Sequence, residues 1–128
     1  MEYLADWNRA LKEIKRVLKP KGLFIFSISN PVTNTLKKIW YKGRKFKIIK
    51  NYFKEGLKED MWEGRFRIRW HRKTYGTIIK FLVKNGFEII DYKDAKPIPR
   101  SKKMFPKEYQ KAIDYPYFCT WKVRKKSH

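Results

Sequence analysis

Apolar residues recur with helical spacing near the start of the chain. Between Trp7 and Leu18 they lie three or four positions apart, which predicts a helix with one buried stripe. Asp6 precedes the stripe at the position of an N-cap, and Pro20 and Gly22 mark the end of the helix. The residues expected in the stripe are Trp7, Ala10, Leu11, Ile14, Val17 and Leu18.

A run of mostly apolar residues, Leu23 to Ser29, follows this helix and contains no charged residue. A strand with one solvated face would alternate apolar and polar residues, and this run does not. It therefore predicts a parallel strand that is covered by helices on both faces. A buried helical turn is the alternative, but the content of Ile and Phe and the Lys-Gly turn before the run favour the strand.

The periodic pattern weakens in residues 32–73. Residues 34–57 are rich in lysine and fit one or two short basic helices. Residues 64–72 alternate instead, which predicts a half-buried strand with one apolar and one cationic face. The apolar face consists of Phe66, Ile68 and Trp70.

Regular patterns return in the last part of the chain. Thr74 as an N-cap and Gly86 as a stop signal bound a predicted helix with one apolar face. A short strand is predicted at residues 87–92, then a helix with Pro106 in its first turn, and a final strand at residues 116–126. The order helix, strand, insertion, helix, strand, loop and strand predicts an α/β fold.

The chain carries 33 Lys and Arg residues against 12 Asp and Glu residues, a net charge of +21. A field of this size attracts nucleic acid, anionic lipid or phosphorylated substrates. The alternative is a lysine-rich proteome in which solvated surfaces default to lysine. The charge is spread along the chain rather than confined to a tail, so both explanations stay open.

The cysteine content and the N-terminal segment indicate where the protein works. Cys119 is the single cysteine, so no intrachain disulfide can form, which fits a reducing compartment. The N-terminal segment is charged rather than signal-like, and no apolar run approaches the roughly 20 residues of a membrane span. We therefore expect a soluble cytoplasmic protein of one modest domain, with Cys119 as a buried, inert thiol.

Four segments of the chain carry a family pattern. In residues 3–31, YLADWNRALKEIKRVLKPKGLFIFSISNP, an Asp-Trp-capped helix leads through Arg-Val-Leu-Lys-Pro to an apolar strand. The other three are WHRKTYGTIIKFLVKNGFEIIDY, AKPIP and YPYFCTWKVRK, at residues 70–92, 95–99 and 115–125. In this order they resemble the C-terminal half of a class I S-adenosylmethionine-dependent methyltransferase of the small-molecule type.

The resemblance implies the fifth to seventh strands of a Rossmann-like methyltransferase sheet, with flanking helices and a basic insertion at residues 32–73 that serves as a substrate lid. Residues 1–128 would then be a partial methyltransferase domain that is inactive alone. In the family, a Gly-rich loop and an acidic residue of the first half bind S-adenosylmethionine. The six glycines of this chain form no G-x-G, so the cofactor site is expected to lie outside it.

Asn30 and Pro31 are the first candidates for substrate binding. They follow the end of a predicted strand, where open α/β sheets bind ligands, and a plain Asn-Pro turn is the alternative. The family usually has His in place of Asn30, and an amide can form hydrogen bonds but cannot titrate near neutral pH. Lys21 also departs from the family, which usually has Gly there, and a turn tolerates this change if φ stays negative.

Further candidates lie in the insertion. Arg69 and His71, with Arg72, are expected to hold an anionic group of the substrate, or else to form a solvated strand face. Trp40 and Tyr52 are expected in an aromatic lid that excludes water, or else in a small satellite core. The other residues of this lid are Tyr41, Phe53 and Trp62. No catalytic residue is assigned, because methyl transfer from a sulfonium depends mainly on positioning.

A second function stays open, that of a non-catalytic basic module that binds nucleic acid. Cations and aromatic rings are interleaved between Lys37 and Lys50, and these are the groups that bind phosphates and stack on bases. No signature of an RNA-binding module is present. The acidic cluster between Glu55 and Glu63 has no His at ligand spacing, so no metal site is expected.

The strand at residues 23–29 also bears on partners. If the chain lacks the fourth strand of the family sheet, one edge of this strand stays open, and open edges recruit other chains. We expect a complementing chain that supplies the N-terminal half of the fold or, failing that, a homodimer through this edge. The charge of +21 opposes self-association and favours the complementing chain.

Overall fold

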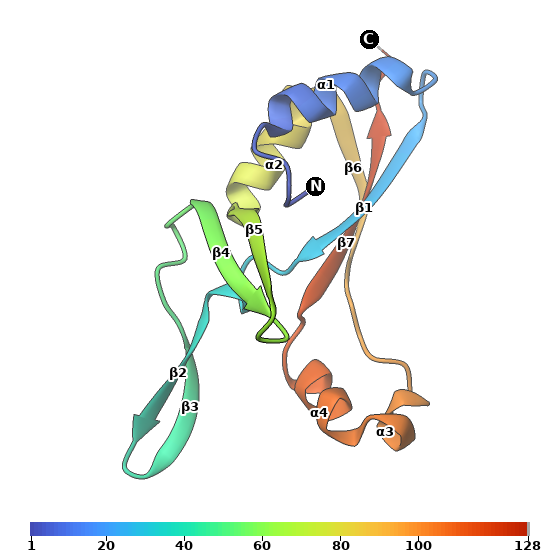
Figure 1. The fold of residues 1–128 in the computed structure, drawn as a ribbon. Helices are drawn as coiled ribbons and strands as arrows, with labels where there is room; N and C mark the ends of the chain where they lie inside the picture. Colours follow the sequence, from blue (N-terminus) through green and yellow to red (C-terminus); the bar gives the residue numbers. More distant parts are fainter. Residues whose placement is uncertain (128) are drawn as a thin grey trace.

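The computed structural model describes residues 1–127 and contains a three-stranded sheet in the order β1-β7-β6 (Figure 1). The strands are β1 (Leu23–Ser29), β6 (Phe87–Asp94) and β7 (Phe118–Lys125). β7 is antiparallel to both neighbours, so β1 and β6 run in the same direction on either side of it. The three strands predicted outside the insertion are thus confirmed, and the fold is α/β.

Two helices, α1 (Trp7–Val17) and α2 (Tyr75–Lys84), lie together against the sheet (Figure 1). Both predicted N-caps are confirmed, because the Asp6 carboxylate accepts from the Arg9 N–H and the Thr74 hydroxyl accepts from the Thr77 N–H. Aromatic contacts join helix to helix and helix to sheet. The buried core consists of Trp7, Leu11, Phe26, Ile28, Ile78, Leu82, Phe87, Cys119, Trp121 and Val123.

The prediction that β1 is buried on both faces is wrong for the described chain. Phe26 and Ile28 are buried, whereas Leu23 and Ile25 on the opposite face are 46% and 59% exposed. The reason is that α1 and α2 share one side of the sheet, and no other described segment covers the second face of β1. Val17 of the predicted helical stripe is also exposed, at 67%, because it lies to one side of the helix face that contacts the sheet.

The insertion consists of two β-hairpins rather than the predicted basic helices. After a short 3-10 turn, η1 (Thr33–Thr35), strand β2 (Leu36–Tyr41) pairs with β3 (Arg44–Ile49). Lys42 and Gly43 between them have positive φ angles of 48° and 74°, the geometry of a two-residue hairpin turn. Aromatic and β-branched residues flank this turn, and their packing on a pleated surface outweighs the helix-forming lysines.

The second hairpin confirms one predicted strand and adds another. β5 (Phe66–Arg72) corresponds to the strand predicted at residues 64–72, and its antiparallel partner is β4 (Gly56–Trp62). The turn again has positive φ angles, at Glu63 and Gly64. Between β6 and β7 lie α3 (Ser101–Met104) and α4 (Pro106–Asp114), with Pro106 in the first turn of α4 as predicted. None of the helices in residues 1–127 is long and apolar enough to cross a membrane.

Replacement by alanine should have opposite effects on stability at a glycine in a hairpin turn and at a glycine in a helix. Gly43→Ala introduces a side chain at a φ of 74° and should weaken the β2–β3 hairpin by about 1 kcal/mol. Gly76→Ala, within α2, meets no atom closer than 3.9 Å and should raise the free energy of unfolding by about 0.5 kcal/mol. Amide hydrogen exchange in β2 and β3 measures the first effect, and urea unfolding measures the second. Unchanged exchange in the Gly43→Ala hairpin would contradict the turn assignment.

Candidate functional site

Asn30 ends β1 and turns the chain into the insertion. Its side chain is 2% exposed, and its Oδ1 accepts hydrogen bonds from the N–H groups of Val32 and Thr33 at 2.9 and 3.0 Å. This is an Asx turn, so the side-chain oxygen of Asn30 is explained by a plain turn. The amide nitrogen has a separate role, because Nδ2 donates to the Tyr75 hydroxyl at 2.9 Å.

That contact begins a chain of hydrogen bonds at the carboxyl ends of β1 and β6. The hydroxyls of Tyr75 and Tyr92 lie 2.6 Å apart, and the Tyr92 hydroxyl donates to Asp94 Oδ1 at 2.9 Å. With Asn30 as a donor at one end and a carboxylate at the other, each hydroxyl donates towards Asp94. Burial raises the pKa of both Tyr75 and Tyr92, so the two phenols stay protonated at neutral pH.

A hollow of about 450 Å³ lies beside this chain of hydrogen bonds. Asn30 and Asp94 line it from the strand ends and Tyr75 from the start of α2, and most of the remaining wall is apolar. Lys47 of β3 also lines it and stands 4.6 Å over the ring of Tyr115. Open α/β sheets bind ligands at the carboxyl ends of their strands, and this hollow occupies such a position. We name it the strand-end hollow.

Pro31 is fully buried next to Asn30, and its carbonyl accepts from Nη1 of Arg72 at 2.8 Å. The same guanidinium donates to Asn34 Oδ1, at 2.8 Å, and to the Tyr52 carbonyl. Burial lowers the pKa of Arg72, although the neighbouring Tyr52 and Glu55 oppose this effect. Arg72 thus joins the end of β1 to the insertion.

The three basic residues that were expected to act together on an anion do not share one face. Arg69 and His71 are two positions apart on β5 and project to the same side, and Arg72 projects to the other. The Arg69 guanidinium forms an exposed ion pair of 2.8 Å with Glu59 on β4. The backbone N–H of His71 donates to the Glu2 carbonyl at 2.7 Å, which ties β5 to the N-terminal segment.

The five aromatic residues of the expected lid lie in three separate places. Trp40, 73% exposed, and Tyr41 stand near the tip of the β2–β3 hairpin, and Trp62 stands at the tip of the other hairpin (Figure 1). Tyr52 and Phe53 lie in the loop before β4. Of the five, Tyr52 is joined to the strand-end hollow, because its hydroxyl accepts from the N–H of Tyr75 at 3.1 Å.

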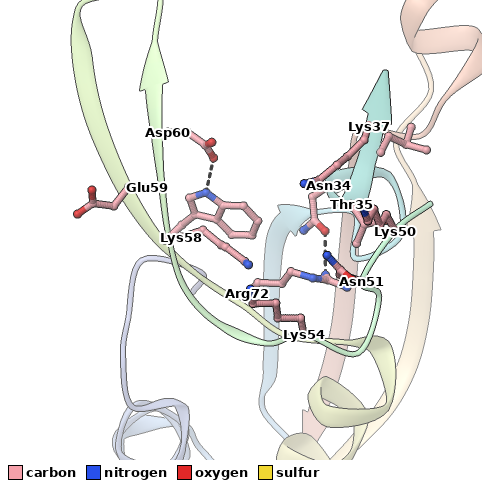
Figure 2. Close-up of a pocket in the computed structure, with 12 residues that line it drawn as sticks. Asn34, Thr35, Lys37, Lys50, Asn51, Lys54, Lys58, Glu59, Asp60 and Arg72 are labelled. Carbon is pink, nitrogen blue, oxygen red and sulfur yellow. Dashed lines mark hydrogen bonds between the residues drawn. The ribbon is translucent and has the colours of Figure 1, made fainter. Parts of the chain in front are cut away.

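A second hollow, of about 300 Å³, lies between the two hairpins (Figure 2). We name it the basic hollow, because five cationic side chains line it: Lys37, Lys50, Lys54, Lys58 and Arg72. It was not predicted, since these residues come from both hairpins and the loop between them, and sequence spacing does not show that they converge.

Three of the four acidic side chains of the insertion, Glu55, Glu59 and Asp60, each bind a separate partner. Glu55 accepts hydrogen bonds from Thr74 and Thr77 at the start of α2, Glu59 pairs with Arg69, and Asp60 accepts from Nε1 of Trp70. Burial would raise the pKa of Glu55, but the hydrogen bonds and the charge of Lys73 lower it. Within residues 1–127 no three His, Cys, Asp or Glu side chains are close enough to hold a metal ion.

Tyr75→Phe tests the chain of hydrogen bonds. Loss of the hydroxyl leaves Asn30 Nδ2 buried without an acceptor, which should lower the free energy of unfolding by about 1–3 kcal/mol. Tyr3→Phe is the matched control, because Tyr3 is 63% exposed and should change stability by less than ~0.5 kcal/mol. Urea unfolding of both variants measures the difference, and equal effects would show that the Tyr75 hydroxyl contributes nothing.

The comparisons with known proteins agree with this fold. A family model described as a methyltransferase domain matches residues 1–26. An S-adenosylmethionine-dependent methyltransferase from Mesorhizobium loti is 26% identical, with a TM-score of 0.79 over 97% of this chain. A candidate S-adenosylmethionine-dependent methyltransferase from Listeria monocytogenes is 26% identical, with a TM-score of 0.77 over 98% of this chain. No curated protein matches the chain.

The chain spans 57% of the length of each of these two structures. The glycopeptide N-methyltransferase MtfA, solved with sinefungin, matches at 14% identity and a TM-score of 0.50, over 95% of this chain and 51% of its own. At that identity the match concerns the fold alone. The resemblance inferred from the four sequence segments is confirmed: in sequence and fold this chain is similar to the S-adenosylmethionine-dependent methyltransferases.

Proposed function

We propose that this chain is the C-terminal, substrate-side portion of a class I S-adenosylmethionine-dependent methyltransferase. The observation that carries the proposal is the strand order β1-β7-β6, with an antiparallel last strand between two strands that run in the same direction. The resemblance implies this arrangement for the fifth, seventh and sixth strands of the family sheet. The coverage of 57% of two such methyltransferases supports it.

The cofactor of this family does not fit the residues that are present. A class I cofactor site needs a Gly-rich loop between a strand and the following helix. Here Gly43 and Gly64 form hairpin turns, and Gly22 and Gly86 precede strands rather than follow them. We therefore place the S-adenosylmethionine site outside this chain and propose that residues 1–128 are a partial domain that is inactive alone.

The strand-end hollow is the proposed place of the methyl acceptor. Asn30 and Tyr75 present polar atoms to it from a fixed chain of hydrogen bonds, and its apolar wall favours exclusion of water. Orientation of the acceptor and exclusion of water are what this half of the fold would contribute, because methyl transfer depends mainly on positioning. Residues 32–73, which include Lys47 and Tyr52, would form the outer wall as a lid. A buried free thiol at Cys119 is compatible with a cytoplasmic location.

We also propose that β1 pairs with a complementing chain. Among the described residues, β1 is paired only with β7, and its other edge is open apart from the Ser29 N–H, which donates to the Glu2 carboxylate at 3.3 Å. Leu23 and Ile25 extend this edge into an exposed apolar face. Open apolar edges recruit a further strand. A homodimer through the same edge is the alternative, and the charge of +21 opposes it.

Nucleic-acid binding is the second candidate function. On one face of the β2–β3 hairpin, Lys38, Lys45 and Lys47 lie together beside the exposed Trp40. A hydrogen bond to Lys38 and the repulsion of the neighbouring lysines lower the pKa of Lys45, which shows how closely the positive charges are packed. Affinity for single-stranded nucleic acid that falls steeply with salt would favour this function over methyl transfer.

Titration calorimetry with S-adenosylmethionine tests the leading proposal. The chain alone should give no saturable heat at micromolar concentrations, because it lacks the Gly-rich loop and the ribose-binding acid. A complete S-adenosylmethionine-dependent methyltransferase in the same buffer is the positive control. Micromolar binding by this chain alone would show that the cofactor site has been misplaced and that the domain is not partial in the proposed sense.

A further inference from the structure

The basic hollow has an excess of positive charge that the described chain does not neutralise. Lys37, Lys50, Lys54 and Lys58 line it, and none of them forms an ion pair with a carboxylate. The ion pairs of residues 1–127 are Arg16–Glu13 and Arg69–Glu59, the second on the outer side of the β4–β5 hairpin. Four ammonium groups around one hollow repel each other unless an anion lies between them.

The two acidic residues at the hollow do not offset this charge. Glu59 is paired with Arg69 at 2.8 Å, and in Figure 2 its carboxylate points away from the lysines. Asp60 accepts the indole hydrogen of Trp70 and lies beyond the ring, on the far side from Arg72 (Figure 2). The space between Lys50, Lys54 and Lys58 is thus bordered by cations and amides.

Arg72 gives this site a fixed inner wall. Its side chain is 3% exposed, and two of its nitrogens donate to Pro31, Asn34 and Tyr52. The third nitrogen, Nε, is buried and has no acceptor within the described chain. A buried guanidinium keeps a permanent positive charge next to the hollow. Because its side chain is already fixed, an anion that binds there would not lose free energy by immobilising it.

We propose that the basic hollow binds the phosphate group of a small organic molecule. A phosphate has three strong acceptor oxygens and up to two charges, which suits several convergent ammonium groups better than a single carboxylate would. A volume of about 300 Å³ is at the lower end for small-molecule pockets. Trp70 and Leu36 supply an apolar part of the wall for the organic portion.

The position of the hollow favours a small molecule over nucleic acid. It lies between the bases of the two hairpins, where Lys37 of β2 and Lys58 of β4 face each other across it (Figure 2). A nucleic-acid strand follows an exposed row of cations, and the exposed Lys38 and Lys45 lie on the opposite face of the β2–β3 hairpin, next to the half-buried Lys47. The inference holds whether or not the chain takes part in methyl transfer.

Calorimetric titration with phenyl phosphate and with inorganic phosphate tests this proposal. Both should bind at one site per chain and compete with each other, and phenyl phosphate should bind more tightly because its ring can contact Trp70. Lys50→Gln with Lys54→Gln should weaken phenyl phosphate binding about tenfold, since each exposed ion pair contributes up to about 1 kcal/mol. Both lysines are exposed, so the double variant should keep the far-ultraviolet circular dichroism of the parent chain.

Lys102→Gln with Lys103→Gln is the matched control. It removes the same charge from α3, which lies apart from the hairpins (Figure 1), and should change binding less than about twofold if the effect is local. Equal weakening in the two double variants would attribute binding to the general field of the protein and overturn the proposal. Absence of saturable binding of phenyl phosphate would also overturn it. So would an oligonucleotide that binds the parent chain but not Lys50→Gln with Lys54→Gln, and that phenyl phosphate does not displace.

Discussion

The pairing of β7 with both β1 and β6 holds the described chain together. β7 brings residues from the end of the chain, Cys119, Trp121 and Val123, between two strands that are far from it in sequence. Trp121 stacks on Phe26 and contacts Tyr75 and Tyr92, so one side chain joins the sheet to α2 and to the strand-end hollow. The helices α1 and α2 cover this face, and the core forms between them and the sheet.

A second set of contacts, at the end of β1, decides how the insertion is placed. Asn30 ends the strand with an Asx turn, and Pro31 then offers its carbonyl to the buried guanidinium of Arg72. Because Arg72 also binds Asn34 and the Tyr52 carbonyl, both hairpins are tied to the same point of the sheet. Arg72 lines the basic hollow, and Asn30, at the same end of β1, lines the strand-end hollow.

Local signals in the sequence predicted most of the elements outside the insertion. Asp6, Thr74 and Pro106 each start a helix for a reason contained in the neighbouring residues, and runs of apolar residues marked the strands. The hairpins were missed because Lys42-Gly43 and Glu63-Gly64 adopt the left-handed geometry that Asn-Gly or Asp-Gly usually signals. Ile39 and Tyr41 in β2, and Phe46 and Ile48 in β3, alternate with other residues, but among so many lysines this pattern also fits a short basic helix.

The candidate sites could be predicted only in part. Asn30 was recognisable because it follows a strand end, but its contact with Tyr75 spans 45 positions and depends on packing. Arg72 looked like Arg69 in sequence, yet the one-residue alternation of β5 turns it inward, where burial and three acceptors give it a structural role. The basic hollow requires two hairpins to meet, and no local pattern reports such a meeting.

We propose that another chain completes the sheet at β1, and sedimentation of the protein isolated from its own cells, together with any bound chain, tests this proposal most directly. The account predicts that the chain is not a free monomer, and that Ile25→Lys, which places a charge on the exposed face of β1, makes it one. Ile79→Lys on α2 is the control, because Ile79 is 41% exposed and away from that edge, and it should leave the association unchanged. A stable, folded monomer of the unmodified chain at all concentrations would contradict the account.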